Sequence, residues 1–401
     1  MPIQSRLARR AMQALVTCAC LLGIWQSWRI ARSDSLFRRG DVESVRTSVR
    51  LEPDCWWCYV KLARLDDSSA EQLLQTSLRL NRYNSDAAID LGLRYESDGD
   101  FRKAEGLLLQ AFEVDDTYVP RWSLANYYLR RHNLPAFWEW SRRATEMPAE
   151  DIGALFELCW RVSPDPKTIE ANIAEDNPAV VRQYIAFLIN KDQPTAAVHA
   201  ALALVHIGSP ESDRILLFTL IDRLIRANDP AGANALWNSI IGRHWIVADN
   251  SFPNNPQFSR DPAQVDFDWH FSAYDGLHSW PGSSGLETEF TGSEPESCWI
   301  ADQTISLPPG RYRLESIYRT RGIAPDTGIR WHILATRSDE ILASSASLSS
   351  EAPSHAVLSF VVSPDQQLLR LRLAYERNLG TPRVSGTLVI TSVRIQSESS
   401  Q

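Results

Sequence analysis

The chain has 401 residues, of which 44% are hydrophobic and 22% charged, and its formal net charge is -8. A chain of this length exceeds one hydrophobic core, so we expect two or three structural units. The acidic balance excludes nucleic acid as an expected partner, because a phosphate-binding surface needs an excess of Lys and Arg.

An apolar segment stands near the N-terminus. Residues 11–28 are mostly apolar and are flanked by Arg9, Arg10, Arg29 and Arg32. About 18 residues is close to the minimum for a helix that spans a bilayer. We therefore predict an uncleaved single-pass anchor that contacts the membrane through residues 11–28.

A cleavable signal peptide is the alternative for this segment, because its apolar core over residues 14–25 is short. No small-x-small cleavage motif follows that core, which favours the anchor. Arginines are similarly frequent on both flanks, so the positive-inside rule fixes the orientation weakly. The short N-terminal tail favours a cytoplasmic N-terminus and an exported body.

Residues 85–116 carry a pattern of small and large residues at spacings of a helical hairpin. The positions are Leu91, Gly92, Tyr95, Gly99, Ala104, Leu108 and Ala111, and Trp122 opens the following unit. Small residues let two helices approach closely, a glycine suits the tight turn between them, and the large residues fill the seam. The segment resembles the tetratricopeptide (TPR) repeat family. This resemblance implies a superhelix whose concave groove binds peptides or protein surfaces.

Similar helix-turn-helix segments surround this unit. We predict about six hairpins, built from the segments 34–52, 57–65, 70–80, 85–116, 122–147, 152–161, 166–174, 178–190, 195–205, 211–227 and 230–241. Trp138 and Trp140 cannot both face inward on one helix, so one of them is a candidate contact residue.

The pattern changes near residue 242. A segment rich in Pro and Asn then lacks any periodicity and is typical of a linker. Beyond it, apolar and polar residues alternate with period two, which predicts about eight strands of a β-sandwich. The predicted strands are 267–271, 286–292, 299–307, 312–319, 329–333, 356–362, 369–375 and 386–395.

This strand order resembles the jelly-roll domains of carbohydrate-binding modules, and the whole chain resembles bacterial membrane-anchored TPR proteins. The resemblance implies that the sandwich binds a polysaccharide. Trp280 and Trp299, which stand near predicted loops, are the candidate glycan contacts.

No sequence motif indicates catalysis, a metal site or a cofactor. Asp266 and Asp268 form a D-x-D pair, but the alternation predicts that both are solvated side chains on the outer face of a strand. Cys55 and Cys58 form a C-x-x-C pair, for which structural packing and a disulfide both remain open. We expect a protein that is not an enzyme.

These features predict an all-α TPR-like solenoid followed by an all-β sandwich or jelly roll, with an N-terminal transmembrane helix. The expected boundaries are 1–30 for tail and anchor, 31–242 for the repeats, 243–265 for the linker, 266–396 for the sandwich and 397–401 for the tail. We expect a scaffold in the bacterial inner membrane with a periplasmic body, which binds proteins through its groove and serves envelope or exopolysaccharide assembly. The alternative is a glycan-binding sandwich that the repeats hold off the membrane.

Overall fold

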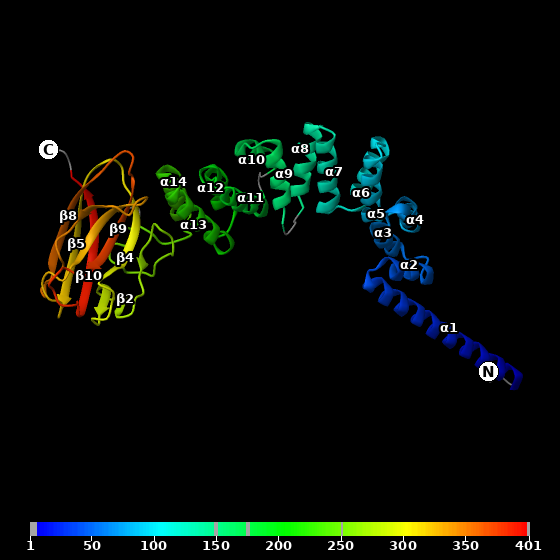
Figure 1. Cartoon of the computed structure of the whole chain (residues 1–401), viewed down its shortest axis with the longest axis horizontal. Coiled ribbons are helices and arrows are strands. Elements are labelled where there is room, and N and C mark those ends of the chain that lie inside the picture. Colours follow the sequence, from blue (N-terminus) through cyan, green and yellow to red (C-terminus); the bar gives the residue numbers. More distant parts are fainter. Residues whose placement is uncertain (1–5, 148–150, 174–176, 250–251, 399–401) are drawn as a thin grey trace. The chain divides into compact units, whose positions relative to one another are not determined.

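The computed structural model describes residues 6–147, 151–173, 177–249 and 252–398. The chain divides into two compact units, Met1–Glu150 and Asp151–Gln401. The first unit is helical, and the second contains further helices followed by two antiparallel sheets (Figure 1). The predicted order, helical hairpins first and strands afterwards, is therefore confirmed.

The first unit consists of antiparallel helix pairs. Its helices are α1 (Arg6–Arg39), α2 (Val42–Leu51), α3 (Trp56–Leu65), α4 (Ala70–Leu80), α5 (Ser85–Ser97), α6 (Phe101–Val114), α7 (Tyr118–Arg130) and α8 (Leu134–Thr145), with a short 3-10 turn at Asp67–Ser69. Capping residues start several of them: Asn84, Asp100 and Asn133 each accept a hydrogen bond from a backbone N–H in the first turn. Such caps satisfy helix donors that otherwise have no partner.

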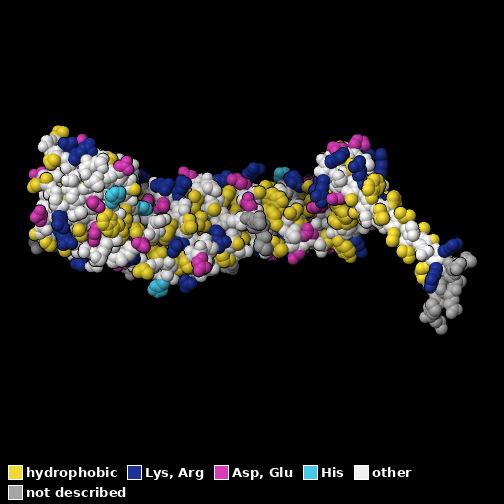
Figure 2. All heavy atoms as spheres, turned by 90° about the horizontal axis from the view of Figure 1, so that it is seen from below, with side chains coloured by type: hydrophobic (Ala, Val, Ile, Leu, Met, Phe, Trp, Pro, Cys, Tyr) yellow, Lys and Arg dark blue, Asp and Glu magenta, His cyan; other side chains and the backbone are white. Residues whose placement is uncertain are grey.

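Helix α1 is longer than the predicted anchor. The side chains of its apolar part are exposed, and hydrophobic side chains are visible along this helix in Figure 2. The helix is long and apolar enough to cross a membrane by length and composition, a test that a signal sequence also passes. The same helix continues into the first hairpin, where Ser33 and Leu36 are buried. The hydroxyl of Ser33 lies 2.8 Å from that of Ser48 on α2. The candidate membrane helix is thus also the first helix of the hairpin stack.

The second unit begins with α9 (Gly153–Val162), α10 (Pro166–Ile173), α11 (Pro178–Asn190), α12 (Val198–Ile207), α13 (Pro210–Arg226) and α14 (Pro230–Gly242), with a 3-10 turn at Thr195–Ala197. Proline starts α11, α13 and α14, where its missing N–H costs nothing. Asp213 on α13 is completely buried and pairs with Arg182 on α11, 2.5 Å from Nε to Oδ1. This ion pair links two neighbouring hairpins.

Ten strands follow in the described part of the chain: β1 (His270–Phe271), β2 (Leu277–Gly282), β3 (Gly285–Phe290), β4 (Ser297–Ser306), β5 (Gly310–Arg321), β6 (Ile329–Ala335), β7 (Ile341–Ser344), β8 (Ser354–Val362), β9 (Leu368–Glu376) and β10 (Gly386–Ser397). They form two five-stranded antiparallel sheets with the orders β1-β4-β9-β6-β7 and β2-β3-β10-β5-β8. Strands β2 and β7 were not predicted. Pro281 and Gly282 mask the alternation of β2, and β7 has only four residues.

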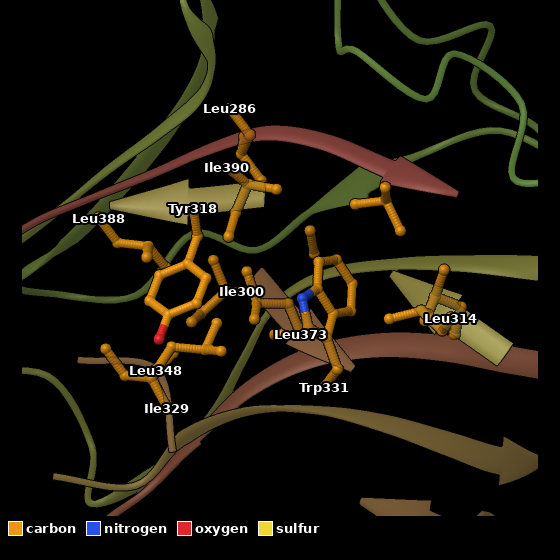
Figure 3. Close-up of a cluster of buried hydrophobic side chains, with 14 of the residues drawn as sticks. Leu286, Ile300, Leu314, Tyr318, Ile329, Trp331, Leu348, Leu373, Leu388 and Ile390 are labelled. Carbon is orange, nitrogen blue, oxygen red and sulfur yellow. The ribbon is translucent and has the colours of Figure 1, made fainter. Parts of the chain in front are cut away.

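Side chains from both sheets meet in one core. Figure 3 shows Trp331 of β6 and Leu373 of β9 among Leu314 of β5 and Ile390 of β10. All four are fully buried. Buried and more exposed residues alternate along β5 and β8, as expected for sheets with one face in the core. The outward residues of β5 are mostly charged, whereas those of β8 include the exposed Val357 and Val361.

The segment that precedes β1 departs from the predicted strand. Phe267 and Trp269 are buried as expected, but no strand covers residues 266–269, and Asp268 is only 1% exposed. The Asp268 carboxylate accepts hydrogen bonds from the N–H groups of Ala263 and Trp269, both at 2.9 Å. The prediction of a solvated Asp268 on an outer strand face is wrong, because the chain turns here and needs a buried acceptor.

Candidate functional site

The seam between α5 and α6 is built from the small residues of the repeat pattern. Gly92 is buried, and a Cβ at this position would lie 3.2 Å from Cγ of Leu108 and 3.3 Å from the carbonyl oxygen of Ala104. Gly99 has a φ of +83° in the turn, which a glycine adopts at little cost. Of the remaining pattern residues, Leu91 and Ala111 are buried and Tyr95 and Trp122 are half-buried.

Ion pairs join the first helices of successive hairpins. Arg64 on α3 pairs with Asp90 on α5 at 2.6 Å, and Arg130 on α7 pairs with Glu96 on α5 at 2.7 Å. Leu93 lies three residues from both Asp90 and Glu96, so it shares their side of α5. It is 41% exposed. We call this side of α3, α5 and α7 the first-helix face.

The two candidate tryptophans of α8 differ in burial. Trp140 is 6% exposed and packs edge-to-face against Phe112 of α6, with ring centroids 4.9 Å apart. Trp138 is half-buried beside Phe137. Trp138 is therefore the residue of the pair that can contact a partner.

The Cys55–Cys58 pair is closed as a disulfide at the start of α3. Both cysteines are at most 2% exposed, and Sγ of Cys58 lies 3.6 Å from the Ser48 hydroxyl. Their burial fits a structural bond, because redox-active cysteines need access to a second thiol. Among the described residues, no group of three or more His, Cys, Asp or Glu side chains is placed to hold a metal ion.

Strand register aligns side chains from four strands on the outer face of the second sheet. Trp280 of β2 pairs with Glu287 of β3, which pairs with Val389 of β10, which pairs with Arg319 of β5. A groove of about 500 Å³ follows this face. We call it the β10 groove, and it is lined by Trp280, Glu287, Arg319, Arg321, Glu351, Thr387 and Val389, together with Thr288, Thr320 and Leu388.

The β10 groove has Thr387 and Val389 as its floor and longer side chains as its walls. Glu287 stands on one wall, and Arg319 on the other. Strands lie about 4.8 Å apart, so β10 separates the backbones of β3 and β5 by about 10 Å, and no ion pair joins Glu287 to Arg319 in the described part of the chain. A Cβ at Gly282 would lie 2.5 Å from Oε1 of Glu287, so the glycine leaves room for this carboxylate.

The two predicted glycan contacts lie on different sheets. Trp280 is 42% exposed and stands at the β10 groove. Trp299 lies on β4 in the other sheet, is half-buried, and its carbonyl accepts a hydrogen bond from the Ser272 hydroxyl. The structure therefore does not bring Trp280 and Trp299 into one site.

A second cleft, of about 930 Å³, lies beside α13 in the same unit. Asp222 lines it and accepts a hydrogen bond from the N–H of Asp266 at 3.0 Å. Burial, and then the nearby Asp266 carboxylate, raise the pKa of Asp222 to about 6. Burial also raises the pKa of Asp268, which lines the same cleft. A carboxyl group with a pKa near neutrality can take up or release a proton at physiological pH.

No family model matches the chain, and no curated protein matches it in sequence. Among solved structures, the chain is similar to YrrB, which is described as a TPR protein with an unusual peptide-binding site. The two sequences are 12% identical, the match covers 51% of this chain and 93% of YrrB, and the TM-score is 0.25. A tetratricopeptide repeat protein from Parabacteroides merdae matches with 11% identity, 55% and 93% coverage and a TM-score of 0.29. PilF of Pseudomonas aeruginosa matches with 14% identity, 55% and 91% coverage and a TM-score of 0.25. TM-scores of this size assign neither a family nor a function.

Proposed function

We propose that the protein is a membrane-anchored scaffold that is not an enzyme and that binds a partner protein through the first-helix face of α3, α5 and α7. The observation that carries this proposal is the stack of hairpins α3–α8, in which neighbouring first helices lie side by side and are fixed by ion pairs. Rigid stacks of this kind present extended surfaces to partners. The exposed Leu93 supplies an apolar contact in the middle of this face.

Crosslinking followed by affinity purification of the full chain tests this function. Leu93→Glu should abolish the main crosslinked protein, because a charge would then enter an apolar contact. Leu80→Glu is the matched control, since Leu80 at the end of α4 is also 41% exposed. Equal recovery of the partner with both variants would rule out the first-helix face.

The proposal includes the cellular setting. Helix α1 would span the bacterial inner membrane once, with the body exported to the periplasm, where the partner would belong to envelope or exopolysaccharide assembly. The exposed apolar part of α1 and the closed Cys55–Cys58 disulfide support an exported body, because disulfides persist in oxidising compartments. Protease protection in intact spheroplasts measures the orientation directly. Protection of the body from external protease would contradict export.

A second candidate function concerns the sandwich alone: it is a glycan-binding module that the helices hold off the membrane. The observation that favours it is Trp280, a large aromatic ring 42% exposed beside unpaired charged side chains. Exposed aromatic rings bind the apolar faces of sugar rings by stacking. Binding of the full chain to a glycan array, lost in Trp280→Ala, is the expected result, and an empty array would contradict it.

A further inference from the structure

We propose that the β10 groove binds a neutral saccharide chain that lies along β10, with one sugar ring stacked on Trp280. Its hydroxyl groups donate hydrogen bonds to Glu287 and accept them from Arg319 and Arg321. This inference rests on the second candidate function and adds the class of glycan and the residues that select it.

The charged side chains of the β10 groove can form hydrogen bonds with a ligand. Its charged side chains are Glu287, Glu351, Arg319 and Arg321, so two negative and two positive groups line it. None of the four has an ion pair or a side-chain hydrogen bond with another residue of the described chain. Their strongest hydrogen-bonding groups are therefore free for a ligand.

The sum of these charges decides between neutral and anionic saccharides. Two carboxylates and two guanidinium groups cancel, so the groove offers donors and acceptors without a net field. A uronate or sulfate group would gain from Arg319 but would be repelled by Glu287 and Glu351. Sugar hydroxyls can both donate and accept, so a neutral saccharide satisfies both walls at once.

The position of the groove on the sheet decides between a saccharide and a peptide. Strands β3 and β5 both pair with β10, so the backbone groups under the groove already have partners. A peptide therefore cannot add a strand here, as it can at a sheet edge. The floor of Thr387 and Val389 contains no deep apolar pocket for an anchoring side chain. One exposed aromatic ring on β2, beside the charged wall of β3, suits a polyhydroxylated ring better.

Isothermal titration of the full chain in detergent tests this inference, with cello-, manno- and xylo-oligosaccharides as neutral probes and oligogalacturonate as the anionic probe. We expect at least one neutral probe to bind, with an affinity that changes less than about twofold between low and high salt. Trp280→Ala should weaken it about tenfold or more, and Trp280→Phe should retain most of it. Arg319→Ala and Glu287→Gln should each weaken it about tenfold.

Two variants serve as controls. Arg394→Ala changes an exposed arginine of β10 outside the groove and should leave binding unchanged. Trp299→Ala changes the tryptophan of the other sheet, and loss of binding there but not in Trp280→Ala would overturn the assignment to the β10 groove. Thermal unfolding of each variant distinguishes a lost contact from a lost fold.

The outcomes separate the inference from the function on which it rests. Binding of oligogalacturonate alone, weakened by salt, would overturn the neutral ligand and leave the sandwich a glycan-binding module. No binding to any neutral or anionic saccharide would overturn both. Capture of a peptide by the groove, lost in Trp280→Ala, would also overturn both.

Discussion

Replacement of Asp222 by Asn should stabilise the protein at high pH. Burial and the Asp266 carboxylate raise the pKa of Asp222 from 3.8 to about 6. The folded protein therefore holds this proton more tightly than the unfolded chain does, and stability falls as the pH rises from about 4 to about 6. Above the folded-state pKa, Asp222 is ionised in the folded protein, and the full loss of stability from its charge is present. Asn removes the charge and keeps an Oδ1 that can accept the Asp266 N–H.

The magnitude follows from the shift in pKa. A shift of about two pKa units corresponds to about 3 kcal/mol. The Asp222 side chain is partly exposed, and solvent screening reduces the expected gain to about 1–2 kcal/mol. For a unit of this size, such a gain raises the melting temperature by about 4 °C.

Thermal unfolding of the full chain in detergent, followed by tryptophan fluorescence, measures the effect at two pH values. We expect Asp222→Asn to raise the melting temperature at about pH 8 and to leave it unchanged at about pH 4. Asp275→Asn, a change of an exposed carboxylate in the same unit, should alter neither value. An equal rise in melting temperature at both pH values, or a lower melting temperature at about pH 8, would refute the electrostatic explanation.

Other changes test the packing of the two units. Gly92→Leu should lower the unfolding free energy by about 2–3 kcal/mol in chemical denaturation, because the α5–α6 seam has no space for a side chain. Arg182→Ala should lower the free energy of unfolding by about 3 kcal/mol above about pH 5. The decrease should be smaller in acid, where the buried Asp213 can be protonated, and an equal decrease at both pH values would contradict this explanation. Cys55 and Cys58 should react with maleimide only after reduction and unfolding, and labelling of the native, unreduced protein would contradict a closed disulfide.

Local signals in the sequence located most helices. The helical-hairpin spacing of apolar residues predicts α4 and α11 with the bounds that the structure has. These features act within one or two helical turns, so they can be read without knowledge of the rest of the fold. The same reasoning failed for Asp268, because the alternation of Phe267 and Trp269 persists where no strand forms.

The β10 groove could be predicted only in part. The sequence predicts the strands that contain Glu287 and Arg319, and it predicts Trp280 as a glycan contact. Their convergence depends on the strand order β2-β3-β10-β5, which brings Val389 beside residues far away in the sequence. No local pattern encodes that order, because the last strand of the chain, β10, pairs with both β3 and β5 in the middle of the sheet.

The continuity of α1 has a consequence for how a partner would be found. Ser33, the first buried contact of the hairpin stack, stands five residues beyond Trp28, the end of the apolar run, which is about 8 Å along a helix. With α1 in a bilayer, the first hairpin would lie among the lipid headgroups. A partner confined to the same membrane would then search in two dimensions at a high effective concentration. Even a contact of modest intrinsic affinity would be occupied there, and the same contact would be lost when the proteins are extracted and diluted.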